Sequence, residues 1–445
     1  MLLWAFAASA VEIRGTGRAE ANVRVGIADC SAGCPWVDFH DAAVLGGELV
    51  VVFPKVRVVG SADLLAHAGT DLTSLDDAGN AAVVSPVSVK IRRSMVALLG
   101  VGSPLLDLEL GVDRIRWGTA DGLSVVDNMN PYDLEDPTKL DQRLSVPLIA
   151  ATLHPGPVQI QAVWTPFFVP AVLPSQVDVL AGANDLFSVD GNNATDVRDV
   201  ESRVSMPEET ILEGNLGGRV SVITGPVDFA ASWVHGRDSL PQVGGELLLT
   251  GFSTDRDRVD VGVPVVYPKI DVGGFEARGE LPWEIGGWSE IAVVFPERTV
   301  ATMSAGQLDS LATLGAIDEV PDPIPSTVTQ DGEPLVRAIV GLDRSIGRVY
   351  VNVQWLHGFP TERQTADLSD YAIANLRVTV SDHWVVSARA VSDLSGVLAG
   401  GEIRYLHGDA AEVWLGAIWI GGSEDSALSG FRAVSNVGTG ASVRF

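Results

Sequence analysis

The sequence predicts an all-β chain that folds as one single-chain transmembrane antiparallel β-barrel of about 18 strands, within a range of roughly 16–20. Three observations support this fold class. Apolar and polar residues alternate with a period of two, as they do on a strand with two different faces. Short turns alternate with long polar loops. The composition is 46% hydrophobic, yet no apolar run reaches the roughly 18 residues that a membrane-spanning helix needs.

The charge excludes other classes of protein. The chain carries 30 Lys and Arg against 57 Asp and Glu, a formal net charge of −27. Nucleic-acid binding requires clustered cations that neutralise phosphates, so no nucleic-acid partner is expected. The same balance argues against a polybasic membrane-surface protein. The high hydrophobic content argues against disorder.

Residues 1–10 are typical of a short secretory signal, because apolar Leu2–Ala7 precedes an A-x-A-like cleavage site at Ala8–Ala10. The apolar stretch is short and follows no Lys or Arg, which a wrongly placed start codon would explain. An ordinary buried N-terminal segment is the alternative. The barrel is then predicted to occupy residues 11–445.

The two cysteines, Cys30 and Cys34, stand in the run C-S-A-G-C. In an exported chain this spacing favours a local disulfide that ties a loop. A two-ligand metal clip is the alternative, but structural zinc takes four ligands and His40 completes no recognisable set. No metal and no cofactor are expected.

The first strand shows the alternation most clearly. Its apolar face carries Val11, Ile13, Gly15, Gly17, Ala19, Ala21, Val23 and Val25. Its polar face carries Glu12, Arg14, Thr16, Arg18, Glu20, Asn22 and Arg24. Taken in order, strands are predicted at 11–28, 45–54, 56–66, 86–101, 104–117, 145–154, 157–168, 211–223, 226–236, 258–279, 287–297, 334–344, 347–359, 371–381, 383–394, 398–407, 410–421 and 435–445.

Turns and loops separate these strands in an asymmetric way. Short turns fall at 102–104, 154–157, 225–226, 345–347 and 407–409. Long polar loops fall at 30–44, 67–85, 118–144, 169–210, 237–257, 299–333, 360–370 and 422–434. This is the signature of short periplasmic turns and long extracellular loops. Proline at Phe53–Lys55, Tyr267–Lys269 and Phe295–Glu297 marks either a turn or an edge kink, which leaves the strand number open.

The apolar faces are predicted to contact lipid, because β-structure can span a bilayer only as a closed barrel. Trp164, Trp233 and Trp355 lie at the long-loop ends of their strands, and Trp288 and Trp384 lie at short-turn ends. Two such groups are what aromatic girdles require. A soluble sandwich, propeller or β-helix is the alternative, but no fixed repeat is present.

The last strand ends in Phe445, which shares a face with Val437, Thr439, Ala441 and Val443. This pattern resembles the insertion signal of bacterial outer-membrane barrels, which implies the barrel-assembly machinery as a partner. Outer-membrane lipid and lipopolysaccharide are the other expected partners. A monomer is favoured.

A more particular resemblance lies at Leu105–Asp136, LLDLELGVDRIRWGTADGLSVVDNMNPYDLED. This stretch, with weaker landmarks at Tyr267–Ile270, Gly279–Glu280 and Val353–Phe359, resembles a largely uncharacterised family of proteobacterial outer-membrane barrels grouped with alginate-export-type porins. The resemblance implies an outer-membrane barrel and passive transport or export of a polar or amphiphilic cargo, but it names no cargo.

Residues of that stretch are predicted to shape a loop at the barrel mouth, with plain loop structure as an equal alternative. They are Arg114, Arg116, Trp117, Asp121, Asn130 and Asp133. The predicted lumen wall carries both charges: Arg14, Arg18, Glu20, Arg24, Lys90, Arg92, Glu109, Arg219, Asp228, Arg337, Arg377, Arg389, Glu402 and Arg404. Cross-strand ion pairs are the structural interpretation, and a conduit that steers anions is the functional one.

Loops 169–210 and 299–333 are candidate lids or plugs, because loops this long are usually functional or disordered. A short helix is predicted at Ser304–Ala316. An inward fold would narrow the lumen, and an outward fold would make a surface cap.

The sequence therefore predicts a porin-like channel or export conduit in the bacterial outer membrane, with no enzymatic activity. One alternative is a structural barrel whose acidic loops bind cations. A barrel hydrolase is another, but there is no G-x-S-x-G motif and the seven histidines are scattered.

Overall fold

The computed structural model describes residues 11–26, 37–38, 43–66, 87–134, 142–172, 196–208, 210, 213–253, 258–313, 324, 326–423, 426, 428 and 435–445. The predicted signal at residues 1–10 and the predicted Cys30–Cys34 disulfide lie outside them. Within these ranges, no helix is long and apolar enough to cross a membrane.

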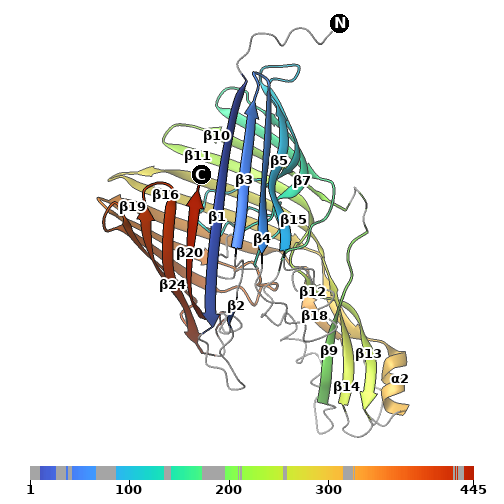
Figure 1. Ribbon diagram of the computed structural model, residues 1–445. Coiled ribbons are helices and arrows are strands. Elements are labelled where there is room, and N and C mark those ends of the chain that lie inside the picture. Colours follow the sequence, from blue (N-terminus) through green and yellow to red (C-terminus); the bar gives the residue numbers. More distant parts are fainter. Residues whose placement is uncertain are drawn as a thin grey trace.

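The molecule is a closed antiparallel β-barrel of 18 strands (Figure 1). The barrel strands are β1 (Glu12–Gly26), β3 (Ala43–Val52), β4 (Val56–Ala66), β5 (Val87–Leu98), β6 (Leu106–Asp113), β7 (Val146–Leu153), β8 (Val158–Thr165), β10 (Asn215–Ile223), β11 (Val227–Arg237), β15 (Lys269–Leu281), β16 (Ile285–Pro296), β19 (Leu335–Ile346), β20 (Val349–His357), β21 (Asp370–Thr379), β22 (Trp384–Ser392), β23 (Gly396–His407), β24 (Ala411–Gly422) and β25 (Asn436–Arg444). Strand β25 pairs with β1 and closes the sheet. The short strand β2 (Val37–Asp38) also pairs with β1.

The predicted barrel is thus confirmed, including its strand number, but one predicted strand is wrong. The range 258–279 contains two elements: β14 (Arg258–Val266), which lies outside the barrel, and β15. Pro268 separates them, because proline has no N–H to give to a strand ladder. By contrast, Phe53–Lys55 forms a turn, in which the N–H of Phe53 donates to the carbonyl of Val56 at 2.7 Å.

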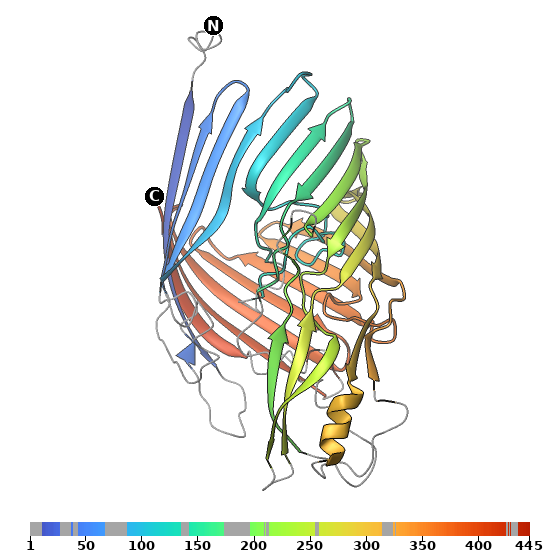
Figure 2. The ribbon, with the colours of Figure 1, turned by 90° about the vertical axis from the view of Figure 1, so that its right-hand side faces the viewer.

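A second sheet of six strands projects from the long-loop end of the barrel (Figures 1 and 2). It contains β9 (Asp196–Val204), β12 (Gln242–Val243), β13 (Gly245–Ser253), β14, β17 (Thr299–Met303) and β18 (Ser326–Gln330). Helix α2 (Ala305–Thr313) lies beside it, which confirms the helix predicted there. The described parts of loops 169–210 and 299–333 therefore contribute strands to an outward extension.

The outer face of the barrel is apolar, with aromatic side chains towards both ends. Trp233 and Trp355, near the long-loop end, are 46% and 45% exposed. Trp384, at the short-turn end, is 46% exposed and packs on Tyr405 with ring centroids 5.1 Å apart. Trp288 does not belong to this girdle: it points inward, is 8% exposed, and its indole covers Gly341. An apolar face that surrounds a closed barrel is a lipid-facing surface.

The final residue takes part in closing the barrel. The N–H of Gly17 donates to the carbonyl of Phe445 at 2.6 Å, and the N–H of Phe445 donates back at 2.9 Å. The ring of Phe445 lies where a side chain at Gly17 would be, and it is 74% exposed on the outer face. The seam between the first and last strands thus depends on a glycine that leaves room for the terminal ring.

One strand glycine provides a test of the wall geometry. Gly111 of β6 has a φ of 146°, and a Cβ there would lie 2.1 Å from the carbonyl oxygen of Ser94. Because backbone cannot move aside cheaply, we expect Gly111→Ala to lower the free energy of unfolding by about 1–3 kcal/mol. Urea unfolding in lipid vesicles, followed by tryptophan fluorescence, measures the change.

The matched control is Gly273→Ala on β15, where a Cβ would have no heavy atom within 4 Å. We expect its unfolding midpoint to equal that of the unmodified chain. Equal midpoints for both variants would show that the backbone at Gly111 is not strained.

Candidate functional site

The segment between β6 and β7 folds into the lumen instead of staying at the rim. We call its residues 114–134 the inward loop; it crosses the interior of the barrel in Figure 2. The sequence predicted a loop at the barrel mouth, and the structure differs because the loop is apolar. Trp117, Val126 and Met129 are 4%, 1% and 1% exposed, and they pack against the inner face of the wall.

The wall is shaped to receive this loop. At Gly217 of β10, a Cβ would lie 2.6 Å from the indole of Trp117 and 2.8 Å from the sulfur of Met129. At Gly274 of β15, a Cβ would lie 2.9 Å from Val126. The missing side chains therefore make two notches that fix where the loop docks.

A buried carboxylate holds the turn of the inward loop. Glu290 of β16 is 0% exposed. One of its oxygens accepts the N–H groups of Thr119 at 2.5 Å and Ala120 at 2.7 Å. The other accepts the hydroxyl of Ser124 at 2.8 Å and the N–H of Val125 at 3.0 Å. A buried carboxylate is stable only with such donors, so Glu290 and the loop depend on each other.

The loop is also tied to itself. The side chain of Asn130 accepts the N–H of Ile115 at 3.0 Å and donates to Asp127 at 2.7 Å. Burial raises the pKa of the Asp127 carboxyl, while the guanidiniums of Arg143 and Arg114 act in the opposite direction. These contacts give the loop one defined shape.

The tip of the inward loop reaches the opposite wall at β20. The carboxylate of Asp121 accepts the hydroxyl of Tyr350 at 3.2 Å and the amide of Asn352 at 3.1 Å. Its carbonyl accepts the amide of Gln354 at 2.7 Å. The loop thus spans the lumen from β6 to β20 and divides it.

One side of the divided lumen is packed. Inward-facing apolar side chains of the wall meet the loop there, where the sequence had predicted polar faces; they include Val146, Leu148, Val163, Val234, Val272, Val294, Leu335, Ile339 and Leu356. The segment after β20 adds to this packing. Buried Arg337 donates to the carbonyl of Glu362 at 2.8 Å, and the hydroxyl of Tyr371 donates to the Glu362 carboxylate at 2.6 Å.

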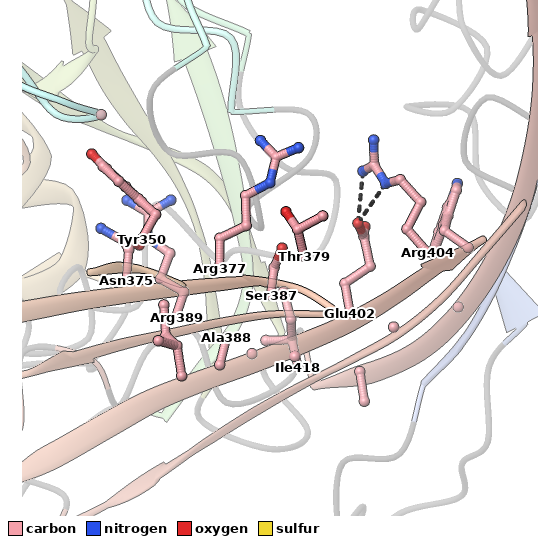
Figure 3. A pocket seen from close by; sticks show the side chains of 18 of the residues that line it. Tyr350, Asn375, Arg377, Thr379, Ser387, Ala388, Arg389, Glu402, Arg404 and Ile418 are labelled. Carbon is pink, nitrogen blue, oxygen red and sulfur yellow. Dashed lines mark hydrogen bonds and ion pairs between the residues drawn. The ribbon is translucent and has the colours of Figure 1, made fainter. Parts of the chain in front are cut away.

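The wall on the other side of the loop borders a cavity. A cavity of about 950 Å³ is bounded by β1, β20 to β25 and the loop tip at Asp121 and Gly122 (Figure 3). The predicted lumen residues Glu20, Arg377, Arg389, Glu402 and Arg404 line it. Tyr350, Asn375 and Trp414, which are not in the predicted lumen set, also line it.

Most of the predicted lumen charges form ion pairs. Arg18 and Arg92 both contact Asp63, Lys90 contacts Asp133, Arg219 contacts Glu276, Asp228 contacts Arg278, Arg14 contacts Glu12, and Arg404 contacts Glu402 and Glu412. Glu109 lies on the inner face of β6, opposite Ala97 and Ala150. Arg24 pairs through its backbone with Gly438. Of the loop residues, Arg114 contacts Asp127 at 3.6 Å, and Arg116 is exposed.

Two histidines of the outer face lie beside carboxylates. His235 contacts Asp271, and His357 contacts Asp370, each at 2.9 Å. Both imidazoles stack on a tryptophan of the outer face, Trp233 and Trp355, with centroids 5.9 and 6.0 Å apart. No serine hydroxyl in the described ranges hydrogen bonds to either imidazole, as a nucleophile would.

Comparisons with known proteins find the fold and no relative by sequence. No protein-family model and no curated protein match the chain. OpdQ of Pseudomonas aeruginosa gives a TM-score of 0.50 at 8% identity, covering 98% of this chain and 97% of that chain. OccAB1 of Acinetobacter baumannii gives 0.49 at 9%, covering 97% and 96%. Salmonella typhi OmpF, in complex with daunomycin, gives 0.42 at 8%, covering 97% of each.

The chain is an outer-membrane β-barrel protein. The likeness to OpdQ extends over nearly the whole of both chains and concerns the fold alone. Together with the closed barrel and its apolar outer face, it confirms the predicted fold and location. The resemblance to alginate-export-type porins stays a prediction.

The anchoring role of Glu290 can be tested. Glu290→Ala leaves four loop donors without an acceptor, which costs about 3 kcal/mol. We therefore expect hydrogen exchange at the amides of Thr119, Ala120 and Val125 to accelerate by about 100-fold. Mass spectrometry of the detergent-solubilised protein measures this exchange.

Glu280→Ala is the control, because Glu280 is an exposed glutamate on the neighbouring strand β15. We expect it to leave exchange in the inward loop unchanged. Slow exchange in both variants would mean that apolar packing alone holds the loop.

Proposed function

We propose that this protein is a porin-like channel that lets small polar solutes diffuse passively across the outer membrane. One observation carries the proposal: the inward loop narrows the lumen without filling it. The cavity left beside the loop has a polar, charged wall on β20 to β25 and β1. A passage through a membrane needs such a wall, because a permeating solute must exchange hydration water for protein contacts.

The inward loop supplies the size limit of this channel. Its tip is held to β20 by three hydrogen bonds that Asp121 accepts, and its turn is held by Glu290. A constriction held in this way has a constant cross-section. The direction of net transport then follows the concentration gradient, so the same geometry serves uptake and export.

The membrane partners belong to the same proposal. The outer face presents tryptophans to the boundary of the bilayer, where lipid and lipopolysaccharide headgroups lie. The exposed ring of Phe445 stands at the seam of the barrel, where an assembly machine would engage the last strand. We propose a monomer as the working unit, since each barrel contains its own passage.

Blocking the cavity from within tests the channel. Thr379 lines the cavity, whereas Ala374 of the same strand faces outward. In a planar bilayer, we expect steady ohmic current from the purified protein. A bulky thiol reagent should reduce the current of Thr379→Cys, because it occupies the passage.

Ala374→Cys is the matched control, and its current should not change. A protein that carries no current in any variant is not a channel. Equal loss of current in both variants would place the passage elsewhere than the cavity.

A further inference from the structure

We infer that the cavity beside the inward loop contains a binding recess for an organic oxyanion, a solute that carries a carboxylate or a phosphate group. This inference rests on the proposed channel function and names the class of solute that binds in the channel while it crosses the membrane. Arg377, Arg389 and Trp414 line the recess, and Figure 3 shows the two arginines.

The first observation concerns two guanidiniums without an acidic partner. Each other arginine of the predicted lumen set whose side chain is described contacts a carboxylate or a buried carbonyl. Arg377 and Arg389 contact no carboxylate among the residues with described side chains, although both line the cavity. The Nε of Arg389 is buried and has no acceptor. A buried donor without a partner is costly, so an acceptor from outside the chain would stabilise this guanidinium.

The two guanidiniums can meet on one ligand. Arg377 pairs in register with Ser387, two residues before Arg389 on β22. Such diagonal neighbours lie about 7–8 Å apart, within the combined reach of two arginine side chains. Figure 3 shows Arg377 extending into the cavity and Arg389 lying beside Asn375. Arginine presents its donors as a planar fork that matches the two oxygens of a carboxylate or phosphate.

The second observation is a group of glycines on the inner face of the wall, which we call the floor of the recess. Glu402 of β23 pairs with Gly416 of β24, and Gly416 pairs with Gly438 of β25. Gly400 lies two residues before Glu402 and stands opposite Arg389. The inner positions of three adjacent strands are therefore empty, and they hollow the wall beside the guanidiniums.

The far side of the recess offers a flat aromatic surface. The indole of Trp414 lies over Gly440, where a Cβ would be 2.5 Å from its Nε1. Trp414 and Arg404 are paired in register and both line the cavity. A solute with a ring or an extended apolar part can lie on this surface while its anionic end binds Arg377 and Arg389. The cavity of about 950 Å³ is at the upper end of the size of small-molecule sites.

Four arginines and four acids line the cavity, so the sign of the solute depends on which of these charges already have a partner. Arg404 lies 2.6 Å from Glu402 and 3.2 Å from Glu412. Glu20 has Arg18 at 3.8 Å. Asp121 accepts two hydrogen bonds from β20. Arg348 has Asp382 at 3.9 Å, so Arg377 and Arg389 are the arginines of this lining without a carboxylate contact among the described side chains, and they favour an oxyanion at their end of the recess.

The loop tip closes the recess from the lumen side. A Cβ at Gly122 would lie 3.4 Å from a terminal nitrogen of Arg389, and the φ of Gly122 is 104°. The guanidinium is thus flanked by loop backbone, which limits its motion and reduces the entropy lost when an anion binds.

Single-channel block with three matched probes tests the recess. Benzoate carries a carboxylate, phenyl phosphate carries a phosphate, and benzamide has a similar shape without charge. We expect at least one of the two anions to reduce the current of the unmodified protein saturably, and benzamide to have no such effect. In Arg377→Gln/Arg389→Gln, the half-blocking concentration should rise about tenfold or more.

Two further variants test the shape of the floor and the effect of an arginine outside the recess. Gly416→Leu fills the floor, so block should weaken while the reversal potential in a salt gradient stays unchanged. Arg14→Gln removes an exposed arginine at the short-turn end and should leave block unchanged. A folded barrel migrates faster than the heat-unfolded chain on a gel, and this confirms that each variant is folded before it is measured.

The outcomes are distinct for the two proposals. A protein that conducts salt, but is blocked equally by benzamide or equally after loss of both arginines, has no oxyanion recess, while its channel function stands. A folded protein that conducts nothing overturns the channel itself. The relative potency of benzoate and phenyl phosphate tells which oxyanion the recess takes.

Discussion

The absence of water inside a lipid bilayer is the constraint on which the rest of the structure depends. Every backbone N–H and C=O that crosses hydrocarbon must find a partner within the protein, so a sheet can cross only if it has no edge. The pairing of β25 with β1 removes that edge. Once the sheet is closed, its two faces meet different surroundings, and the alternation of apolar and polar residues follows from this difference.

Closure of 18 strands creates a second requirement, because the enclosed space is too wide for wall side chains to fill. The inward loop fills one side of it, and its apolar residues turn the inner face of that wall into a core. Glu290 makes this arrangement specific, since its two oxygens fit only one path of the loop backbone. The cavity of about 950 Å³ lies along the side that the loop does not fill.

The strands were predictable because strand signals are local. Alternation, turn residues and proline positions lie within a few residues of each other, and they placed all but one barrel strand. The error at 258–279 arose where β14 leaves the barrel and pairs in parallel with β9, a distant partner that no local pattern encodes.

The inward loop was not predictable for the same reason. Thr119 and Glu290 are 171 residues apart, and their contact exists only after the barrel has closed. A signal was nevertheless present: Glu290 is a lone carboxylate on an inner face otherwise formed by Trp288, Ala292 and Val294. An isolated charge at such a position needs a buried partner, and Gly217 and Gly274 on nearby strands leave room for the apolar side chains of the loop that supplies it.

The net charge of −27 describes the whole chain and not the passage. Several acidic residues of the inner face contact an arginine of the same or a neighbouring strand, and this contact reduces both charges. Arg377 and Arg389 have no such contact because their cross-strand neighbours are Tyr350, Ser387, Asn375 and Gly400. The electric field in the lumen therefore depends on which residues face each other across adjacent strands. The two guanidiniums therefore make the field positive where they lie, although the chain as a whole is acidic.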